Sequence, residues 1–151
     1  RLHNSTDQMK AFPHAQHVYL AGGIEGLTLE QATGWRKRAT QVLDSFDIDT
    51  LDPCRRVSFI DSKARHADAR IWKADLQDIA FSTVILANLC DSLPGKKWGT
   101  VAEIAHAHTK NKILIVLMDE NQFHHPFITQ YATEIHYTIE DACEAVTHYF
   151  Q

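Results

Sequence analysis

The stretch Thr83-Val-Ile-Leu-Ala-Asn88 decides the fold of this chain. It is a short, nearly all-apolar run between two segments with helical periodicity, Ala67 to Ala80 before it and Gly99 to Lys110 after it. A strand that does not alternate between polar and apolar residues needs cover on both faces, and helices that flank it in sequence supply that cover. The pattern therefore predicts a central strand of a parallel sheet.

Strand-like runs recur on both sides of this one. They are His17 to Ala21, Ile48 to Leu51, Lys112 to Met118 and Thr133 to Tyr137. Helical periodicity lies between them, in an apolar stripe from Ala32 to Phe46 and again from Ile139 to Phe150, while the polar stretch from Cys54 to Arg65 is expected to be a long loop. Five strands that alternate with helices predict an α/β fold, a single-domain, flavodoxin-like, doubly wound five-stranded parallel sheet with helices on both faces.

Composition limits the class of protein. The chain has 151 residues, of which 44% are hydrophobic and 23% charged, which fits one compact domain and not a disordered or collagen-like chain. We expect residues 1–8, ahead of Met9, to be a disordered lead or foreign to the natural chain, and residues 9–151 to form the domain. The longest apolar run, Ile113 to Met118, is too short to span a membrane, so we expect a cytoplasmic protein with no membrane partner.

Charge, cysteine and histidine usage narrow the partners further. Fifteen basic and 19 acidic residues give a net charge of −4, which argues against binding a nucleic-acid polymer. Three widely spaced cysteines without a C-x-x-C pair indicate reduced thiols in a cytosolic setting. His106 and His108 lie on different sides of their predicted helix, and the single Glu103-x-x-His106 pair falls short of a di-metal site. We therefore expect no metal and no cofactor.

The glycine-rich turn after the first strand fits none of the common phosphate motifs. Gly22-Gly23-Ile24-Glu25-Gly26 matches neither G-x-G-x-x-G nor the P-loop, and the chain has no G-x-S-x-G nucleophile elbow. Ligands of doubly wound sheets bind beyond the carboxyl ends of the strands. Those ends place the candidate site in the loops that start at Gly22, Asp52, Asn88 and Asp119.

Acidic side chains gather at that edge of the predicted sheet. They are Asp52, Asp75, Asp78, Asp91 and Glu103. Thr100-Val-Ala-Glu103 matches a capping box, so Glu103 either satisfies backbone donors or, as a carboxylate kept ionised in the first helical turn, acts as a nucleophile. Asp75 shares a helix face with Ile71 and Asp78, which would raise its pKa and let it hold a proton at neutral pH. One ionised and one protonated carboxyl beside a small cleft can cleave a glycosidic bond through a covalent intermediate; the alternative for each acid is a solvated surface position.

Five short motifs follow one another along the chain. They are Val18-Tyr-Leu-Ala-Gly-Gly-Ile24, Trp35-Arg36, Leu51-Asp-Pro-Cys-Arg-Arg56, Ala74-Asp-Leu-Gln-Asp-Ile79 and Trp98-Gly-Thr-Val-Ala-Glu-Ile104. In order and spacing they resemble the nucleoside 2-deoxyribosyltransferase family, most closely its short phage-like and bacterial members. The resemblance covers about His17 to Val116. It implies transfer of 2-deoxyribose between nucleobases through a covalent deoxyribosyl-Glu intermediate, with net retention.

The resemblance also implies a role for individual residues. Glu103 would attack C1′ of the nucleoside, Asp75 would handle the proton of the base, and Tyr19 would hydrogen-bond the nucleophile. The implied substrate contacts are Gly22, Gly23, Asp52, Arg55, Asp78, Trp98 and Gly99, with a place in the core as the alternative for Trp98. Lys97 stands where relatives carry a sugar-binding Asp six residues before the nucleophile, so the chain departs from the family's sugar clamp.

The implied partners are small-molecule 2′-deoxyribonucleosides and free nucleobases, handled in nucleotide salvage by a homo-oligomer with active sites near subunit interfaces. A related enzyme class on the same fold, the deoxynucleoside 5′-monophosphate N-glycosidases, directs water to the same ester. Arg55, Arg56, Lys96 and Lys97 would provide basic groups for such a phosphate. A non-catalytic nucleotide-binding module is the second alternative.

Overall fold

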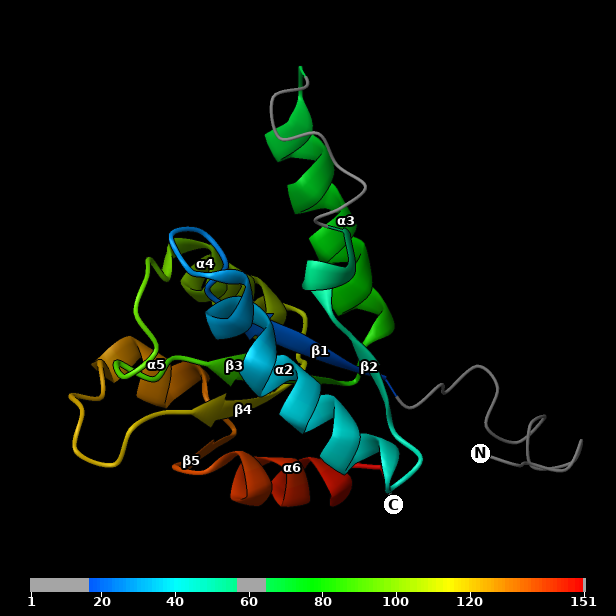
Figure 1. The fold of residues 1–151 in the computed structure, drawn as a ribbon. Coiled ribbons are helices and arrows are strands. Elements are labelled where there is room, and N and C mark those ends of the chain that lie inside the picture. Colours follow the sequence, from blue (N-terminus) through cyan, green and yellow to red (C-terminus); the bar gives the residue numbers. More distant parts are fainter. Residues whose placement is uncertain (1–16, 57–64, 151) are drawn as a thin grey trace, which may run out of the picture.

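The structure is a computed structural model that describes residues 17–56 and 65–150 (Figure 1). Its elements in chain order are β1 (His17–Gly22), α2 (Leu29–Asp44), β2 (Asp49–Leu51), the 3-10 helix η1 (Pro53–Arg56), α3 (Ala67–Phe81), β3 (Val84–Asn88), α4 (Trp98–Thr109), β4 (Ile113–Leu117), α5 (Pro126–Tyr131), β5 (Glu134–His136) and α6 (Ile139–Thr147). The predicted lead at residues 1–8 and most of the predicted loop from Cys54 to Arg65 lie outside the described residues.

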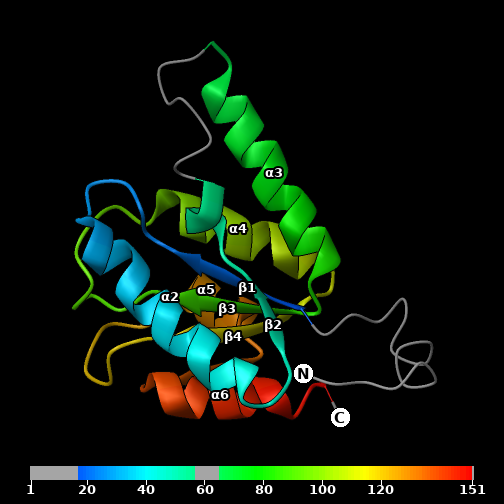
Figure 2. The same cartoon turned by 45° about the vertical axis from the view of Figure 1, so that its right-hand side comes forward.

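All five strands pair in parallel, in the order β2-β1-β3-β4-β5. The alternation of β1 feeds two separate cores, since Val18 and Leu20 pack with α2 and α6 while Tyr19 and Ala21 pack with α3, α4 and α5. Figures 1 and 2 show these helices on the two faces of the twisted sheet. The predicted fold class is confirmed. Within the described residues, every helix falls short of the length or apolarity needed to cross a bilayer.

Several element ends differ from the expected ones. The helix that holds Glu103 begins at Trp98 with Lys97 as N-cap and no capping side chain, so the capping box predicted at Thr100 is wrong. Phe46 does not extend the apolar stripe, because α2 ends at Asp44 and Phe46 is 55% exposed. The short helix α5 was not expected from periodicity; Pro126 opens it, and the His125 ring accepts the Phe127 N–H at 3.1 Å.

A close approach between β1 and α2 requires glycine at position 22. The Trp35 ring packs so tightly against Gly22 that a Cβ there would lie 2.6 Å from Trp35 Cζ2. Glycine therefore allows the helix to seat its indole on the end of the strand, beside the edge where ligands bind.

We expect Gly22→Ala to lower the free energy of unfolding by about 1–3 kcal/mol, as for overpacked cores. Gly34, on the exposed face of the same helix, is the matched control because nothing lies within 4 Å of a Cβ built there. Gly34→Ala should stabilise the protein by up to about 1 kcal/mol through helix propensity. Urea denaturation of both variants measures the contrast; equal stabilities would contradict the close packing.

Candidate active site

Glu103 of α4 meets Tyr19, which lies in the middle of β1. Tyr19 alternates onto the face of β1 that α4 covers, and its hydroxyl donates to Glu103 Oε2. The Tyr19 residue has no exposure and Glu103 is 6% exposed, so both polar groups depend on each other for hydrogen bonding. The alternation of β1 and the start of α4 together bring them into contact.

Burial dominates the protonation of Glu103. It raises the pKa of the Glu103 carboxyl to about 8, against the opposing effect of the Tyr19 hydrogen bond. The expectation that Glu103 is ionised at neutral pH is wrong because burial raises its pKa, and the expectation that it lies in the first helical turn is wrong because α4 begins at Trp98. Burial also raises the pKa of Tyr19, which keeps its hydroxyl a donor.

Asp75 of α3 is the second carboxyl of the site. Burial raises its pKa to about 6, and the nearby Asp78 adds to the rise, while Arg56 opposes it. Arg56 Nη1 donates to Asp75 Oδ1 at 2.9 Å. The raised pKa expected for Asp75 is confirmed, but the order of the two acids is reversed: Glu103 holds its proton to higher pH because it is buried more deeply and has no arginine bound to its oxygens in the described structure.

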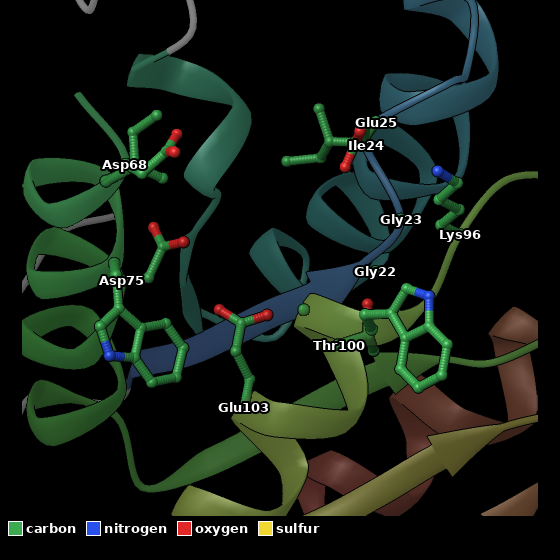
Figure 3. Close-up of a pocket in the computed structure, with 13 residues that line it drawn as sticks. Gly22, Gly23, Ile24, Glu25, Asp68, Asp75, Lys96, Thr100 and Glu103 are labelled. Carbon is green, nitrogen blue, oxygen red and sulfur yellow. The ribbon is translucent and has the colours of Figure 1, made fainter. Parts of the chain in front are cut away.

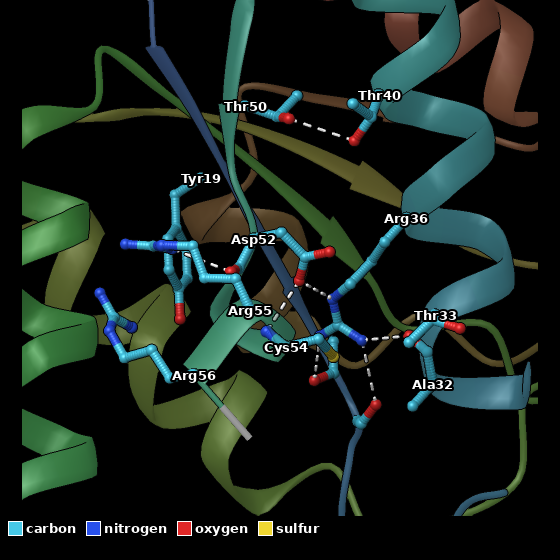
Figure 4. Close-up of polar contacts among 12 residues, drawn as sticks. Tyr19, Ala32, Thr33, Arg36, Thr40, Thr50, Asp52, Cys54, Arg55 and Arg56 are labelled. Carbon is cyan, nitrogen blue, oxygen red and sulfur yellow. Dashed lines mark hydrogen bonds and ion pairs between the residues drawn. The ribbon is translucent and has the colours of Figure 1, made fainter. Parts of the chain in front are cut away.

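Three of the expected substrate contacts, Asp52, Arg55 and Asp78, instead make ion pairs with other residues or with one another. Figure 4 shows the surroundings of Asp52 and Arg55. Asp78 lies 2.8 Å from Arg55 Nη2 and also pairs with Arg56. Asp52 accepts the Cys54 N–H at 2.8 Å and so caps η1. Asp52, Arg55 and Asp78 are not among the residues that line the hollow beside Glu103, so the structure does not bring these three expected contacts to it. Arg55 and Asp78 bind the 3-10 helix η1 to α3, whereas Asp52 pairs with Arg36 of α2.

Glu103 points into a hollow of about 260 Å³ between the loop after β1, the helix α3 and the start of α4 (Figure 3). Its lining residues are Gly22, Gly23, Ile24, Glu25, Asp68, Ile71, Trp72, Asp75, Lys96, Trp98, Gly99, Thr100 and Glu103. The volume suits one small molecule and not a polymer. The hollow thus brings together six of the expected site residues: Gly22, Gly23, Asp75, Trp98, Gly99 and Glu103.

Sequence reasoning missed part of this lining. Trp98 is 81% exposed, which excludes a core position and leaves its ring at the mouth of the hollow. Asp68 and Trp72 also line it, although Asp75 and Asp78 were the site residues expected from α3. Offsets of four and three residues place these side chains on one helix face, and that spacing was the signal that could have found them.

Among the described residues, no cluster of three or more His, Cys, Asp or Glu side chains is arranged to hold a metal ion.

Comparison with known proteins gives matches among solved structures only. No family model and no curated protein matches the chain. A 2-deoxyribosyltransferase from Bacillus psychrosaccharolyticus aligns with a TM-score of 0.70 and 18% identity over 83% of this chain and 88% of that chain. A CMP N-glycosidase from Clostridium botulinum aligns with a TM-score of 0.57 and 13% identity over 87% and 98%.

A 2-deoxyribosyltransferase from Leishmania mexicana aligns with a TM-score of 0.53 and 19% identity over 70% of this chain and 65% of that chain. At such identities the likeness establishes the fold. The chain has the fold of the 2-deoxyribosyltransferases, as the sequence resemblance implies. The named neighbours are enzymes that act on N-glycosidic bonds.

The raised pKa of Glu103 predicts a cost to stability at neutral and alkaline pH. As pH rises from 4.5 to about 8, the unfolded chain releases the Glu103 proton while the folded protein keeps it, so the free energy of unfolding falls. Glu103→Gln removes this titration and still accepts from Tyr19. Urea denaturation should show the variant gaining stability over the natural protein as pH rises from about 5 to about 8. A difference that stays constant with pH would contradict the raised pKa.

Proposed function

We propose that this protein transfers 2-deoxyribose between nucleobases by a retaining double displacement, with Glu103 as the nucleophile. The observation that supports this most is the placement of two carboxyl groups, Glu103 and Asp75, on one hollow of nucleoside size, both with raised pKa values. Such a pair supplies both a nucleophile and a proton donor for the cleavage of a glycosidic bond.

In the first displacement, the Glu103 carboxylate forms a bond to C1′ as the bond from C1′ to the base nitrogen breaks. Protonated Asp75 gives its proton to the departing base, either directly or through water. In the second, the nitrogen of another base attacks C1′ and breaks the ester, which returns the electron pair to Glu103. The Asp75 carboxylate takes the proton of the incoming base. Tyr19 holds Glu103 in place through its hydroxyl.

The two acids act as one titrating pair in this mechanism. Between about pH 6 and about 8 they hold a single proton, which rests mainly on Glu103 in the empty site. The reaction needs the same proton on Asp75, with Glu103 ionised. We infer that substrate binding redistributes the proton within the pair, and that the singly protonated pair is the active form.

Other lining residues suit the parts of a nucleoside. Trp72 and Trp98 offer ring faces for the base. Gly22 and Gly23 present backbone to the sugar. The Lys97 ammonium donates a hydrogen bond to the Leu93 carbonyl at 2.7 Å, and Lys97 does not line the hollow. Lys97 therefore does not replace the family's sugar-binding Asp. We propose that the carboxylates of Glu25 and Asp68 accept from the sugar hydroxyls instead.

The second candidate is hydrolysis of a 5′-monophosphate nucleotide by the same pair, with water as the acceptor. Lys96 favours it, because it is the basic residue among the described lining residues and would suit a phosphate. Arg55 and Arg56 do not add to that site, since both are bound to Asp78. The similarity of the fold to that of a CMP N-glycosidase supports this second candidate.

Incubation of the protein with 2′-deoxyinosine and adenine should yield 2′-deoxyadenosine, measured by chromatography. Glu103→Ala should abolish the exchange, and Asp75→Asn should slow it by about 10²-fold through loss of the proton donor. Asp91→Asn is the matched control, because Asp91 is an exposed acid at the same sheet edge that does not line the hollow.

Without an acceptor base, mass spectrometry should find a deoxyribosyl adduct on Glu103. Full activity of Glu103→Ala would overturn the mechanism. Release of hypoxanthine without exchange, above all from the 5′-monophosphate, would replace transferase with hydrolase.

The value of kcat/KM for the exchange should depend on pH as a bell. Below about pH 6 both carboxyls are protonated and the nucleophile is lost; above about pH 8 both are ionised and the proton donor is lost. The maximum should therefore lie between these limbs. Initial rates at low substrate across the pH range, with protein stability measured in parallel, test this. A rate that rises steadily to alkaline pH would contradict a required proton on Asp75.

A further inference from the structure

Arg36 of α2 is a charged side chain with no exposure to solvent. Taking a guanidinium out of water is costly unless its donors are satisfied, so a fully buried arginine needs an arrangement of acceptors. None of the roles proposed for Glu103, Asp75 and Tyr19 uses this residue. Arg36 lies behind the backbone that lines the hollow, and its burial there needs a physical explanation.

The contacts of Arg36 join three segments, of which the Gly22–Gly23 segment lines the hollow (Figure 4). Its Nη2 donates to the Gly22 carbonyl at 2.8 Å, and its Nη1 donates to the Gly23 carbonyl at 3.4 Å and to the Ala32 carbonyl. Its Nε lies 3.4 Å from Asp52 Oδ1. Gly22 and Gly23 form the wall of the hollow, so the guanidinium fork fixes that wall from behind.

The contact with Asp52 extends to the other side of the site. Asp52 caps η1 through the Cys54 N–H, and η1 carries Arg56, which binds Asp75. The buried Arg36 guanidinium thereby connects two parts of the site. One is the Gly22–Gly23 backbone, and the other is η1, whose Arg56 binds Asp75. Arg36 also lies over the Trp35 ring, 4.9 Å from its centroid, which fixes the direction of the fork.

Charge is the second contribution of Arg36. The charged groups that act on Glu103 are Asp75 and Asp78 of α3, which raise its pKa, and Arg36, which lowers it; Tyr19 adds a hydrogen bond. Glu25, Asp68 and Lys96 line the same hollow. Arg36 also lowers the pKa of Asp75. In a buried region the positive charge is weakly screened, so it acts on both acids at once.

We propose that Arg36 is a positioning residue of this site: its fork fixes the Gly22–Gly23 backbone from behind, its Nε faces Asp52 in the turn before η1, and it places a buried positive charge behind the hollow that holds Glu103 and Asp75. The kinetic part rests on the proposed transfer activity. The titration of Glu103 does not rest on that activity, so the inference about Arg36 and the proposed function can fail separately.

The test uses two variants and one control in the full chain. Arg36→Met removes both charge and fork, whereas Arg36→Lys keeps the charge but not the planar fork. Arg38→Met is the matched control, because Arg38 lies on the same helix and pairs with Glu140 at the surface, 3.0 Å away. The Glu103 carboxyl is titrated by carbon-13 NMR, and kcat/KM for the deoxyinosine–adenine exchange is measured across pH.

We expect Arg36→Met to move the Glu103 titration, and with it the bell-shaped rate profile, to higher pH. Arg36→Lys should leave the titration near that of the natural protein but lower kcat/KM at its optimum by about 10²-fold, as for a misplaced site. Arg38→Met should change neither. If the natural protein transfers no deoxyribose, the titrations still decide the electrostatic part.

An unchanged titration in Arg36→Met, or full kcat/KM in Arg36→Lys, would overturn the respective half of the proposal. If Arg36→Met does not fold, Arg36→Lys decides the positioning half by its rate. If neither variant folds, Arg36 serves the stability of the fold and the proposal is rejected.

Discussion

The site depends on how β1 is buried on both faces. A parallel strand between two helical layers sends alternate side chains to opposite cores, so Tyr19 reaches the layer of α4 while its neighbours Val18 and Leu20 reach that of α2. Tyr19 is thereby placed where Glu103 needs a donor. A shift of the strand by one residue would exchange the two sets and remove the hydrogen bond, which ties the chemistry of Glu103 to the register of the sheet.

The strands, the helices and their order could be predicted because they follow from local patterns. Continuous apolar runs and helical spacing depend on residues close in sequence, and they were sufficient for the five-stranded sheet. The start of α4 was harder, because the capping pattern at Thr100 competed with a helix that begins at Trp98 without a capping side chain. That difference of less than one turn puts Glu103 away from the helix end, where the dipole would favour its ionisation, and burial raises its pKa instead.

The site could be predicted where residues follow a strand directly and not where partners are distant in sequence. Gly22 and Gly23 were found from their place at the end of β1, and Glu103 from the resemblance of the motif that contains it. The pairing of Arg55 and Arg56 with Asp78 joins residues more than twenty positions apart, and no local pattern indicates it. Basic residues beside acids at one sheet edge therefore suggested substrate contacts, although the charges satisfy one another first.

The likeness to both a 2-deoxyribosyltransferase and a CMP N-glycosidase has a physical explanation in this arrangement. Formation of a glycosyl ester needs a nucleophile, a proton donor and a pocket that excludes bulk water. These requirements are the same whether a base or water then attacks the ester. The acceptor is chosen by what fills the space above C1′ after the first base departs. In this chain Trp72 and Trp98 line the hollow and are partly or largely exposed. Two such ring faces would retain a base better than they would order a water molecule, which is the physical ground for the transfer proposed above.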